Sequence, residues 1–225
     1  MKKTFFLFPI AALAVCSAFS PAPVTNGAIF TMTMNSSRGM TGNIVVYYDV
    51  PGTRIEVNAT ANGIPVQKIS LVKKSEPTMV YMLDERSKTY STSDVSGAGT
   101  GKSEGAAKAT FIGNDSLNGF WCKHCKVTQG PKTYEVWNTT GITEYTQFSG
   151  VMNKQRYLGN QEMHDALKAI GAEGFPVKTI MTDKDGTTTT TLQKVEHKPL
   201  DASLFTVPSD YKAGAAPPAF PGPGH

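Results

Sequence analysis

The sequence contains few cysteines and little charge, and both shortages exclude classes of protein. Three cysteines in 225 residues are too few for a small fold held together by disulfide bonds. Charged residues make up 18% of the chain and the formal net charge is +4, which does not predict a nucleic-acid-binding surface. Beyond the N-terminus no apolar run approaches the roughly 20 residues of a membrane-spanning helix, so we expect no transmembrane segment in the mature chain.

Sequence motifs of catalytic and cofactor-binding sites are also missing. There is no Gly-x-Ser-x-Gly nucleophile elbow. Gly101, Lys102 and Ser103 match the end of a phosphate-binding loop, but Ser96 stands where that loop has its first glycine. We therefore predict no nucleotide, no other cofactor and no metal ion, and we expect a binding protein rather than an enzyme.

The N-terminal segment has the pattern of a secretory signal peptide. Lys2 and Lys3 precede an apolar stretch at residues 5–15, and small residues follow it. The apolar stretch is too short to span a membrane as a helix. We assign residues 1–22 to the signal peptide and expect a periplasmic or secreted protein.

Cys16 lies inside this segment and allows a second interpretation, in which the mature protein is anchored to a membrane by a lipid on that cysteine. A lipoprotein cleavage site has a small residue before the cysteine, and Val15 is larger. In the first interpretation Cys16 is removed with the signal peptide. The exported chain then keeps only Cys122 and Cys125.

Most of the remaining chain alternates apolar and polar residues, as half-buried strands do. Turn signals such as Pro51-Gly52 separate the segments at intervals close to the ~8–12 residues of an antiparallel meander. The predicted strands are residues 27–34, 44–50, 54–60, 66–72, 78–83, 88–92, 108–112, 120–128, 133–138, 177–182 and 187–195. We expect one mostly-β (α+β) domain over residues 27–212, built on a twisted antiparallel sheet.

Two segments differ from the rest by composition. Residues 96–107 (SGAGTGKSEGAA) are rich in glycine and alanine, which predicts a flexible loop inside the domain. Residues 213–225 are rich in glycine and proline and follow the last predicted strand. They predict a disordered C-terminal tail.

One segment, residues 160–170, has the periodicity of a helix. Asn160 suits the N-cap and Gly171 the first position after the helix. Apolar residues recur at the spacing of one helix face: Met163, Ala166, Leu167 and Ile170. Because an apolar sheet face must be covered in water, we expect this helix to pack on the sheet.

Several stretches carry a resemblance to a known family. They are residues 47–57 (YYDVPGTRIEV), 80–91 (VYMLDERSKTYS), 119–137 (GFWCKHCKVTQGPKTYEVW) and 198–212 (KPLDASLFTVPSDYK). Together they resemble an uncharacterised family of exported bacterial proteins, which is itself similar to the outer-membrane lipoprotein carrier and related lipoprotein-sorting proteins. The resemblance implies a half-open β-barrel whose apolar concave face is covered by one or two helices. In the carriers that face holds the acyl chains of a lipoprotein.

The resemblance and the methionine content predict a site for a lipid or another apolar small molecule. The candidate ligand-binding residues lie on the first strand and on the predicted helix: Phe30, Met32, Met34, Met163, Leu167 and Ile170. Flexible thioethers suit an apolar surface that adapts to different chains. The alternative is that these side chains only fill the core, in a structural envelope protein that has no ligand. Peripheral association with the cell envelope agrees with either interpretation.

The pair Cys122 and Cys125 supports an alternative function. Trp-Cys-x-x-Cys resembles the thioredoxin-type redox motif, in which the first cysteine is a nucleophile at a helix N-terminus. The residues after Cys125 favour a strand instead. A structural disulfide between the two requires a bulge or turn, because a straight strand keeps their Cα atoms too far apart and directs the thiols to opposite faces. A metal site that includes His124 would lack further ligands at a recognised spacing.

Overall fold

The computed structural model describes residues 26–96, 105–142, 144–145 and 161–214. The predicted signal peptide, most of the predicted loop at residues 96–107 and most of the predicted tail lie outside these residues. The first half of the domain contributes six strands: β1 (Asn26–Ser36), β2 (Met40–Asp49), β3 (Gly52–Ala61), β4 (Ile64–Lys73), β5 (Met79–Asp84) and β6 (Thr89–Asp94). The second half contributes the others: β7 (Lys108–Leu117), β8 (Phe120–Gln129), β9 (Lys132–Thr139), β10 (Phe175–Asp183), β11 (Gly186–Pro199) and β12 (Lys212–Ala213).

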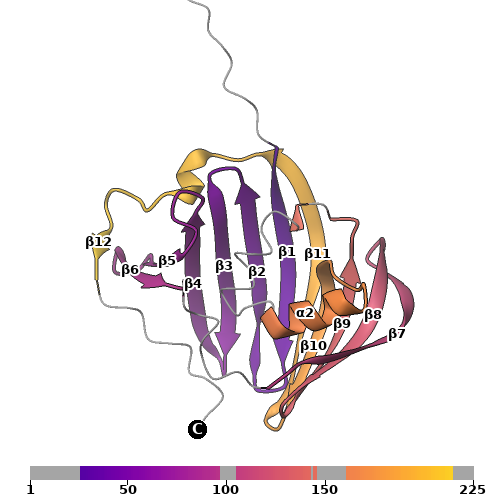
Figure 1. The fold of residues 1–225 in the computed structure, drawn as a ribbon. Helices are drawn as coiled ribbons and strands as arrows, with labels where there is room; N and C mark the ends of the chain where they lie inside the picture. Colours follow the sequence, from indigo (N-terminus) through magenta and orange to yellow (C-terminus); the bar gives the residue numbers. More distant parts are fainter. Residues whose placement is uncertain (1–25, 97–104, 143, 146–160, 215–225) are drawn as a thin grey trace, which may run out of the picture.

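These strands form a 12-stranded sheet in the order β12-β6-β5-β4-β3-β2-β1-β11-β10-β9-β8-β7. Each half is a run of antiparallel hairpins, and the two halves meet where β11 pairs with β1. The sheet is twisted and open, with β12 and β7 at its two ends, and it does not close into a barrel (Figure 1). The prediction of a mostly-β fold on a twisted antiparallel sheet is thus confirmed.

The helix α2 (Gln161–Ala169) lies within one residue of the predicted helix at each end. Gly171 takes the predicted position after the helix, with a φ of +64° and an N–H that donates to the Lys168 carbonyl. α2 packs against β7 and β8 (Figure 1). None of the helices in the described part of the chain is both long and apolar enough to cross a membrane.

Strand β7 is longer than the prediction of residues 108–112. Its register with β8 shifts between Phe111 and Gly113, which is a β-bulge, and the pairing then continues to Leu117. The hairpin turns at Asn118 and Gly119, which both have positive φ. Asn-Gly is a strong signal for a two-residue turn of this kind, so the longer strand is explained by local chemistry.

The chain after β11 covers the face of the sheet opposite α2. Asp201 accepts a hydrogen bond from the Ser203 N–H and so caps the 3-10 helix η2 (Ala202–Phe205). Phe205 is buried against Ile69, Leu71 and Leu83 on β4 and β5. β12 then pairs with β6 in parallel, and the Gly214 N–H donates to the Tyr90 carbonyl. Ala213 and Gly214, the first residues of the predicted tail, therefore belong to the folded domain.

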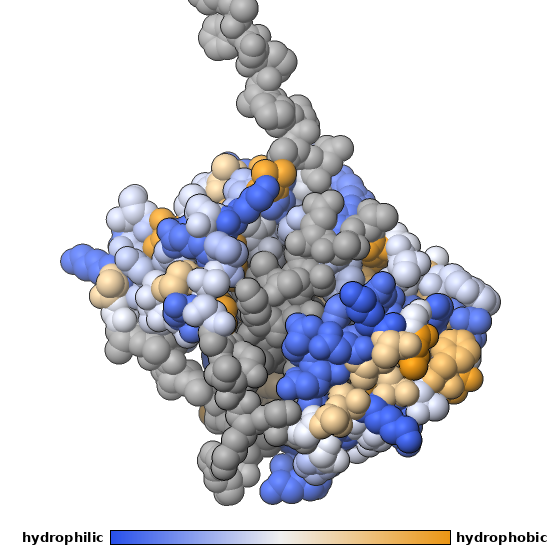
Figure 2. All heavy atoms as spheres, in the orientation of Figure 1, coloured by the Kyte–Doolittle hydropathy of each residue, from blue (hydrophilic) through white to orange (hydrophobic). Residues whose placement is uncertain are grey.

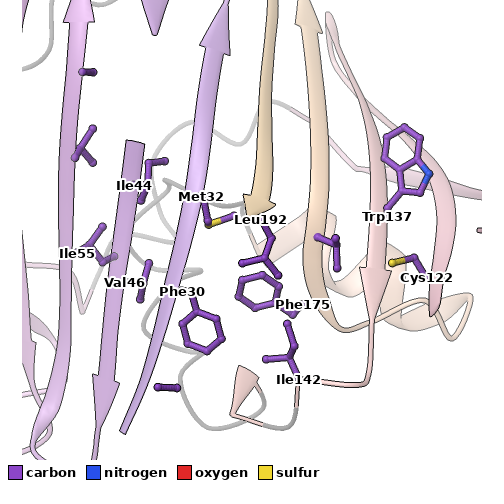
Figure 3. Close-up of a cluster of buried hydrophobic side chains, with 14 residues drawn as sticks. Phe30, Met32, Ile44, Val46, Ile55, Cys122, Trp137, Ile142, Phe175 and Leu192 are labelled. Atoms are coloured by element: carbon purple, nitrogen blue, oxygen red, sulfur yellow. The ribbon is translucent and has the colours of Figure 1, made fainter. Parts of the chain in front are cut away.

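The main core lies at the junction of the two halves of the sheet. Phe30 on β1 stacks on Phe175 at the start of β10, with the ring centroids 5.1 Å apart. Phe30, Phe175 and Leu192 point toward one another (Figure 3), and none of them has measurable exposure to solvent. These contacts join strands that are distant in sequence, so they hold the two runs of hairpins together.

Candidate functional site

The described residues hold a small pocket between α2 and the sheet. Met163 and Leu167 are the buried residues of α2. They pack on a second cluster, which we call the helix cluster, with these buried residues of β8, β9 and the turn after α2: Cys125, Val127, Tyr134, Val136 and Ala172. The amphipathic pattern that predicted the helix also selects the face that it buries.

α2 is fixed to the sheet at its C-terminal end. The Asn138 side-chain amide on β9 donates to the Ala172 carbonyl at 2.8 Å, and the Lys123 ammonium on β8 donates to the Gly171 carbonyl. The chain then turns at Gly174, where a Cβ would lie 2.4 Å from the Thr139 carbonyl oxygen, so this close approach requires glycine. These contacts hold the segment directly after α2 in place on the sheet, and the helix extends over the sheet from there.

The cavity under α2 has a volume of about 20 Å³. Its apolar wall is formed by Val136, Met163, Leu167 and Pro176, and its polar wall by Asn138, Tyr145, His164 and Glu173. A cavity of this size holds about one water molecule. With α2 in this position there is no room for an acyl chain.

Two polar groups of the pocket carry marked electrostatic features. Burial, and next the nearby Glu173 carboxylate, raise the pKa of the Tyr145 hydroxyl above its ordinary value. Tyr145 therefore keeps its proton at physiological pH and can donate a hydrogen bond. His164 lies with its Nδ1 atom 3.6 Å from the Asp165 carboxylate. The polar wall thus combines a hydroxyl donor, Tyr145, with an acidic side chain, Glu173.

The register of the sheet shows how the predicted residues on β1 relate to this pocket. Residues directly opposite one another in neighbouring strands share a face. One such row crosses five strands from β1 to β8 and consists of Met34, Thr190, Thr179, Val136 and Cys125. Met34 therefore lies on the face that α2 covers, and Phe30 and Met32 share that face by alternation.

Sharing a face does not bring all the predicted residues together. Met163 and Leu167 line the pocket. Phe30 and Met32 are fully buried in the main core and Met34 packs against its border. Ile170 follows the last turn of α2 and is 37% exposed. The structure therefore places two of the six predicted residues at the pocket and the other four outside it.

An aromatic chain connects the pocket with the main core. Tyr145 lines the pocket and packs edge-on against Phe175, with the ring centroids 5.9 Å apart. Phe175 in turn stacks on Phe30. Tyr145, Glu173 and Asn138 are not among the predicted site residues, because each belongs to a turn or strand end with no periodic pattern. Only the tertiary contacts bring them to α2.

The two cysteines occupy different parts of the core. β8 keeps an unbroken register with β9, so Cys122 and Cys125 point to opposite faces, and both are free thiols. Cys125 belongs to the helix cluster and Cys122 to the main core. Burial is the largest cause that raises the pKa of each thiol. A redox nucleophile requires the opposite shift.

The same alternation bears on the metal interpretation. His124 shares the face of Cys122, and its ring stacks on Trp137 at a centroid distance of 4.0 Å. Cys125 points to the opposite face, so these three side chains do not converge on one point.

A family model described as "Domain of unknown function (DUF4412)" matches residues 27–211. The search of the curated proteins gave no match. A structure of an uncharacterised conserved protein from Thermus thermophilus is similar, with a TM-score of 0.50 and 11% identity over 85% of this chain and 91% of that chain.

Two further solved structures are more distant. The complex structure of Pseudomonas aeruginosa MucA/MucB has a TM-score of 0.45 and 9% identity, over 85% of this chain and 59% of that chain. The LolA superfamily protein NE2245 from Nitrosomonas europaea has a TM-score of 0.31 and 8% identity, over 82% of this chain and 91% of that chain. At these identities a likeness concerns the fold alone.

Proposed function

Since the chain belongs to the family of domains of unknown function DUF4412, a name that assigns no activity, we propose a function from the geometry: a non-enzymatic binding protein for a lipid or another apolar ligand. The ligand is held between α2 and strands β9 and β10. The observation that carries the proposal is the pocket under α2, with one apolar and one polar wall. An amphiphile presents this combination of surfaces.

Ligand entry in this proposal requires α2 to move, because the cavity of about 20 Å³ is too small for a chain. The attachment of α2 supports such a movement. Among the described residues, side-chain hydrogen bonds tie the chain to the sheet at Gly171 and Ala172, directly after the last turn of α2. The helix itself has nine residues, which is too short to be stable without its packing on the sheet. α2 can therefore lift about the segment 171–174.

The surface that such a movement exposes is suited to an apolar chain. Lifting α2 uncovers Val136, Cys125 and the other side chains of the helix cluster. Tyr145 and Phe175 continue this apolar surface toward the main core. Methionines contribute on both sides, with Met163 on α2 and Met181 on β10, and their flexible side chains adapt to ligands of different shape.

The proposal is tested by native mass spectrometry of the protein purified from its exporting host, before and after incubation with a phospholipid. We expect a non-covalent adduct of lipid mass on the wild type. The same spectrum gives the mass of the processed N-terminus and so tests the predicted removal of residues 1–22. An apo mass in both samples, under conditions that preserve known lipid complexes, contradicts the proposal.

A reversible crosslink separates the role of α2 from an effect on stability. Leu167→Cys introduces a second thiol into the helix cluster, which already holds Cys125. Oxidation with diamide then joins α2 to β8 as a disulfide, with loss of two hydrogens that the mass detects. We expect lipid loading of the reduced variant and no loading of the oxidised one. Equal loading of both forms shows that the ligand does not enter under α2.

A matched pair of substitutions provides the control. Leu167→Asp places a carboxylate on the buried face of α2, whereas Ala169→Asp places the same group on its exposed face. We expect the first to abolish loading and the second to leave it unchanged. Equal loss in both variants would mean that charge on the helix, and not its packing, controls the result.

A further inference from the structure

A second surface, beside α2, has no role in the proposed function. Six large apolar side chains are exposed among the described residues, and four of them lie on β7, β8 and the end of α2: Phe111, Ile112, Trp121 and Ile170. We call these four residues the edge patch. Figure 2 shows apolar side chains where α2 meets β7, bordered by hydrophilic residues.

The strand register and one hydrogen bond place the four residues around the C-terminal end of α2. Trp121 and Lys123 alternate on β8 and so point to one face, and Lys123 donates to Gly171, the neighbour of Ile170. Phe111 is paired with Cys125, which packs under α2. Ile112 is the residue at the β-bulge of β7, the strand that ends the sheet.

Trp121 is the most exposed member, at 69%. A tryptophan ring with this exposure is costly to leave in water, and Trp121 is not needed for the core. The other tryptophan of the chain has a different environment. Trp137 is buried, stacks on His124 and donates from its indole nitrogen to Asp115. The chain thus holds one structural tryptophan and one that faces outward.

The edge patch is too small for a stable protein interface. From the exposed fractions, which run from 37% to 69%, the four side chains present on the order of 400 Å². A stable complex needs about 800 Å² from each partner. Insertion of a few side chains into a lipid surface has no such minimum, because the charge around them adds to the attraction.

The charges around the edge patch are mainly positive. Two lysines lie beside it, while Asp115, the acidic side chain on β7 and β8, is paired with Cys122 and so points to the opposite face. Glu162 and Asp165 precede the last turn of α2, away from Ile170. The lysines are Lys123, which shares the face of Trp121 on β8, and Lys168 in the last turn of α2, whereas the register directs Lys108 and Lys126 to the opposite face. Exposed tryptophan with isoleucine and phenylalanine, bordered by lysine, is the composition of a surface that docks on anionic lipid headgroups.

We propose that the edge patch docks the protein on an anionic lipid surface, with Phe111, Ile112 and Trp121 inserted among the headgroups. The lysines contact the lipid phosphates. Docking in this orientation places the end of α2 against the membrane. The inference rests on the patch itself and does not require a ligand under α2.

The experiment measures co-sedimentation with vesicles of phosphatidylcholine that contain phosphatidylglycerol, and with vesicles of phosphatidylcholine alone. We expect binding to the anionic vesicles that decreases as salt is added, and weaker binding to the neutral ones. Trp121 supplies a second readout, because its emission shifts to shorter wavelength when the ring leaves water. Trp121→Phe removes that shift and leaves Trp137 as an internal reference.

Substitutions at exposed positions separate docking from folding. Phe111→Ser with Ile112→Ser removes apolar surface from the patch, and we expect at least about tenfold weaker binding to anionic vesicles. Ile64→Ser is the matched control, since Ile64 is 67% exposed on β4, away from the patch, and it should not change binding. Lys168→Gln should weaken binding to anionic vesicles only, whereas Lys126→Gln, on the opposite face of β8, is the matched control and should not change binding.

Three results would overturn the proposal. One is no binding to anionic vesicles at low salt. Another is equal binding by the Phe111→Ser, Ile112→Ser variant and the Ile64→Ser control. The third is a dimer in solution, detected by light scattering, that the Phe111→Ser, Ile112→Ser substitutions dissociate, because the patch would then be an interface between two copies of the chain. Failure of docking leaves the loading experiment on α2 unaffected, so the two proposals fail separately.

Discussion

Replacement of Phe30 by alanine tests whether the face of β1 is part of a filled core or the wall of a ligand site. Phe30 has no exposure to solvent and stacks on Phe175. If the core is filled as the structure shows, the truncation leaves a cavity that its neighbours cannot fill. If a ligand occupies this face, part of the side chain's contacts are with the ligand and its removal costs the apo protein little.

The expected cost follows from the burial. Loss of the transfer free energy of a buried phenylalanine contributes about 2 kcal/mol. A cavity of up to ~100 Å³ adds about 2 kcal/mol at ~24 cal/mol per Å³. We therefore expect Phe30→Ala to lower the free energy of unfolding by about 4 kcal/mol. For a domain of this size that corresponds to a fall in Tm of about 8–16 °C.

The assay is urea denaturation followed by far-UV circular dichroism, with the m-value fitted independently for each variant. Met34→Ala is the control on the same strand, because Met34 is only partly buried at the border of the main core. We expect it to cost about 1 kcal/mol, in proportion to its smaller burial. A loss below about 1 kcal/mol for Phe30→Ala, with an unchanged m-value, would refute the filled core at this position.

Two other predictions concern titrating groups. A hydrogen bond from Arg38 holds the pKa of the Asp183 carboxyl below its ordinary value of 3.8. The contribution of Asp183 to stability is present above the unfolded pKa and is lost as the pH falls through the lower folded pKa. When the urea midpoint is measured against pH, Asp183→Asn should therefore reduce the loss of stability at acid pH. The same loss in the variant and the wild type would contradict this. Burial raises the pKa of Cys122 and Cys125, so both thiols should react with a disulfide reagent only as fast as the protein opens; rapid labelling of the native protein at neutral pH would show an exposed thiolate.

Much of the fold could be predicted because its signals are local. Alternation located the strands of both halves, and the spacing of Met163 and Leu167 located α2 and its buried face. The longer β7 was missed although its signal, Asn118-Gly119, is present in the sequence. The reason is that a β-bulge interrupts the alternation before that turn.

The C-terminal elements were missed for a different reason. η2 and β12 are short and have little intrinsic preference for their conformation. Phe205 stabilises this segment through its contact with β4 and β5, and β12 exists because β6 offers an unpaired edge. Neither partner is near in sequence, so no local pattern could indicate the ordered path through Gly214.

The candidate site shows the same division. Met163 and Leu167 were identified because a helix pattern marks them. Tyr145 and Glu173 reach the pocket only because β9 ends and α2 turns where they do. Phe30 carries the same apolar signal as a ligand-facing residue, and only its contact with Phe175 distinguishes the two interpretations. Hydrophobicity predicts that a side chain is buried, but it does not predict whether the side chain contacts the core or a ligand.

Local sequence patterns were enough to predict a mostly-β domain with an amphipathic helix, because strands and helices bury side chains at fixed spacings along the chain. The position of that helix, the apolar residues that fill the core, and those that surround the pocket and the edge patch follow from tertiary contacts. These contacts depend on pairing between strands that are far apart in the sequence, such as β1 and β11. The local sequence pattern around either residue does not indicate a contact over such a separation.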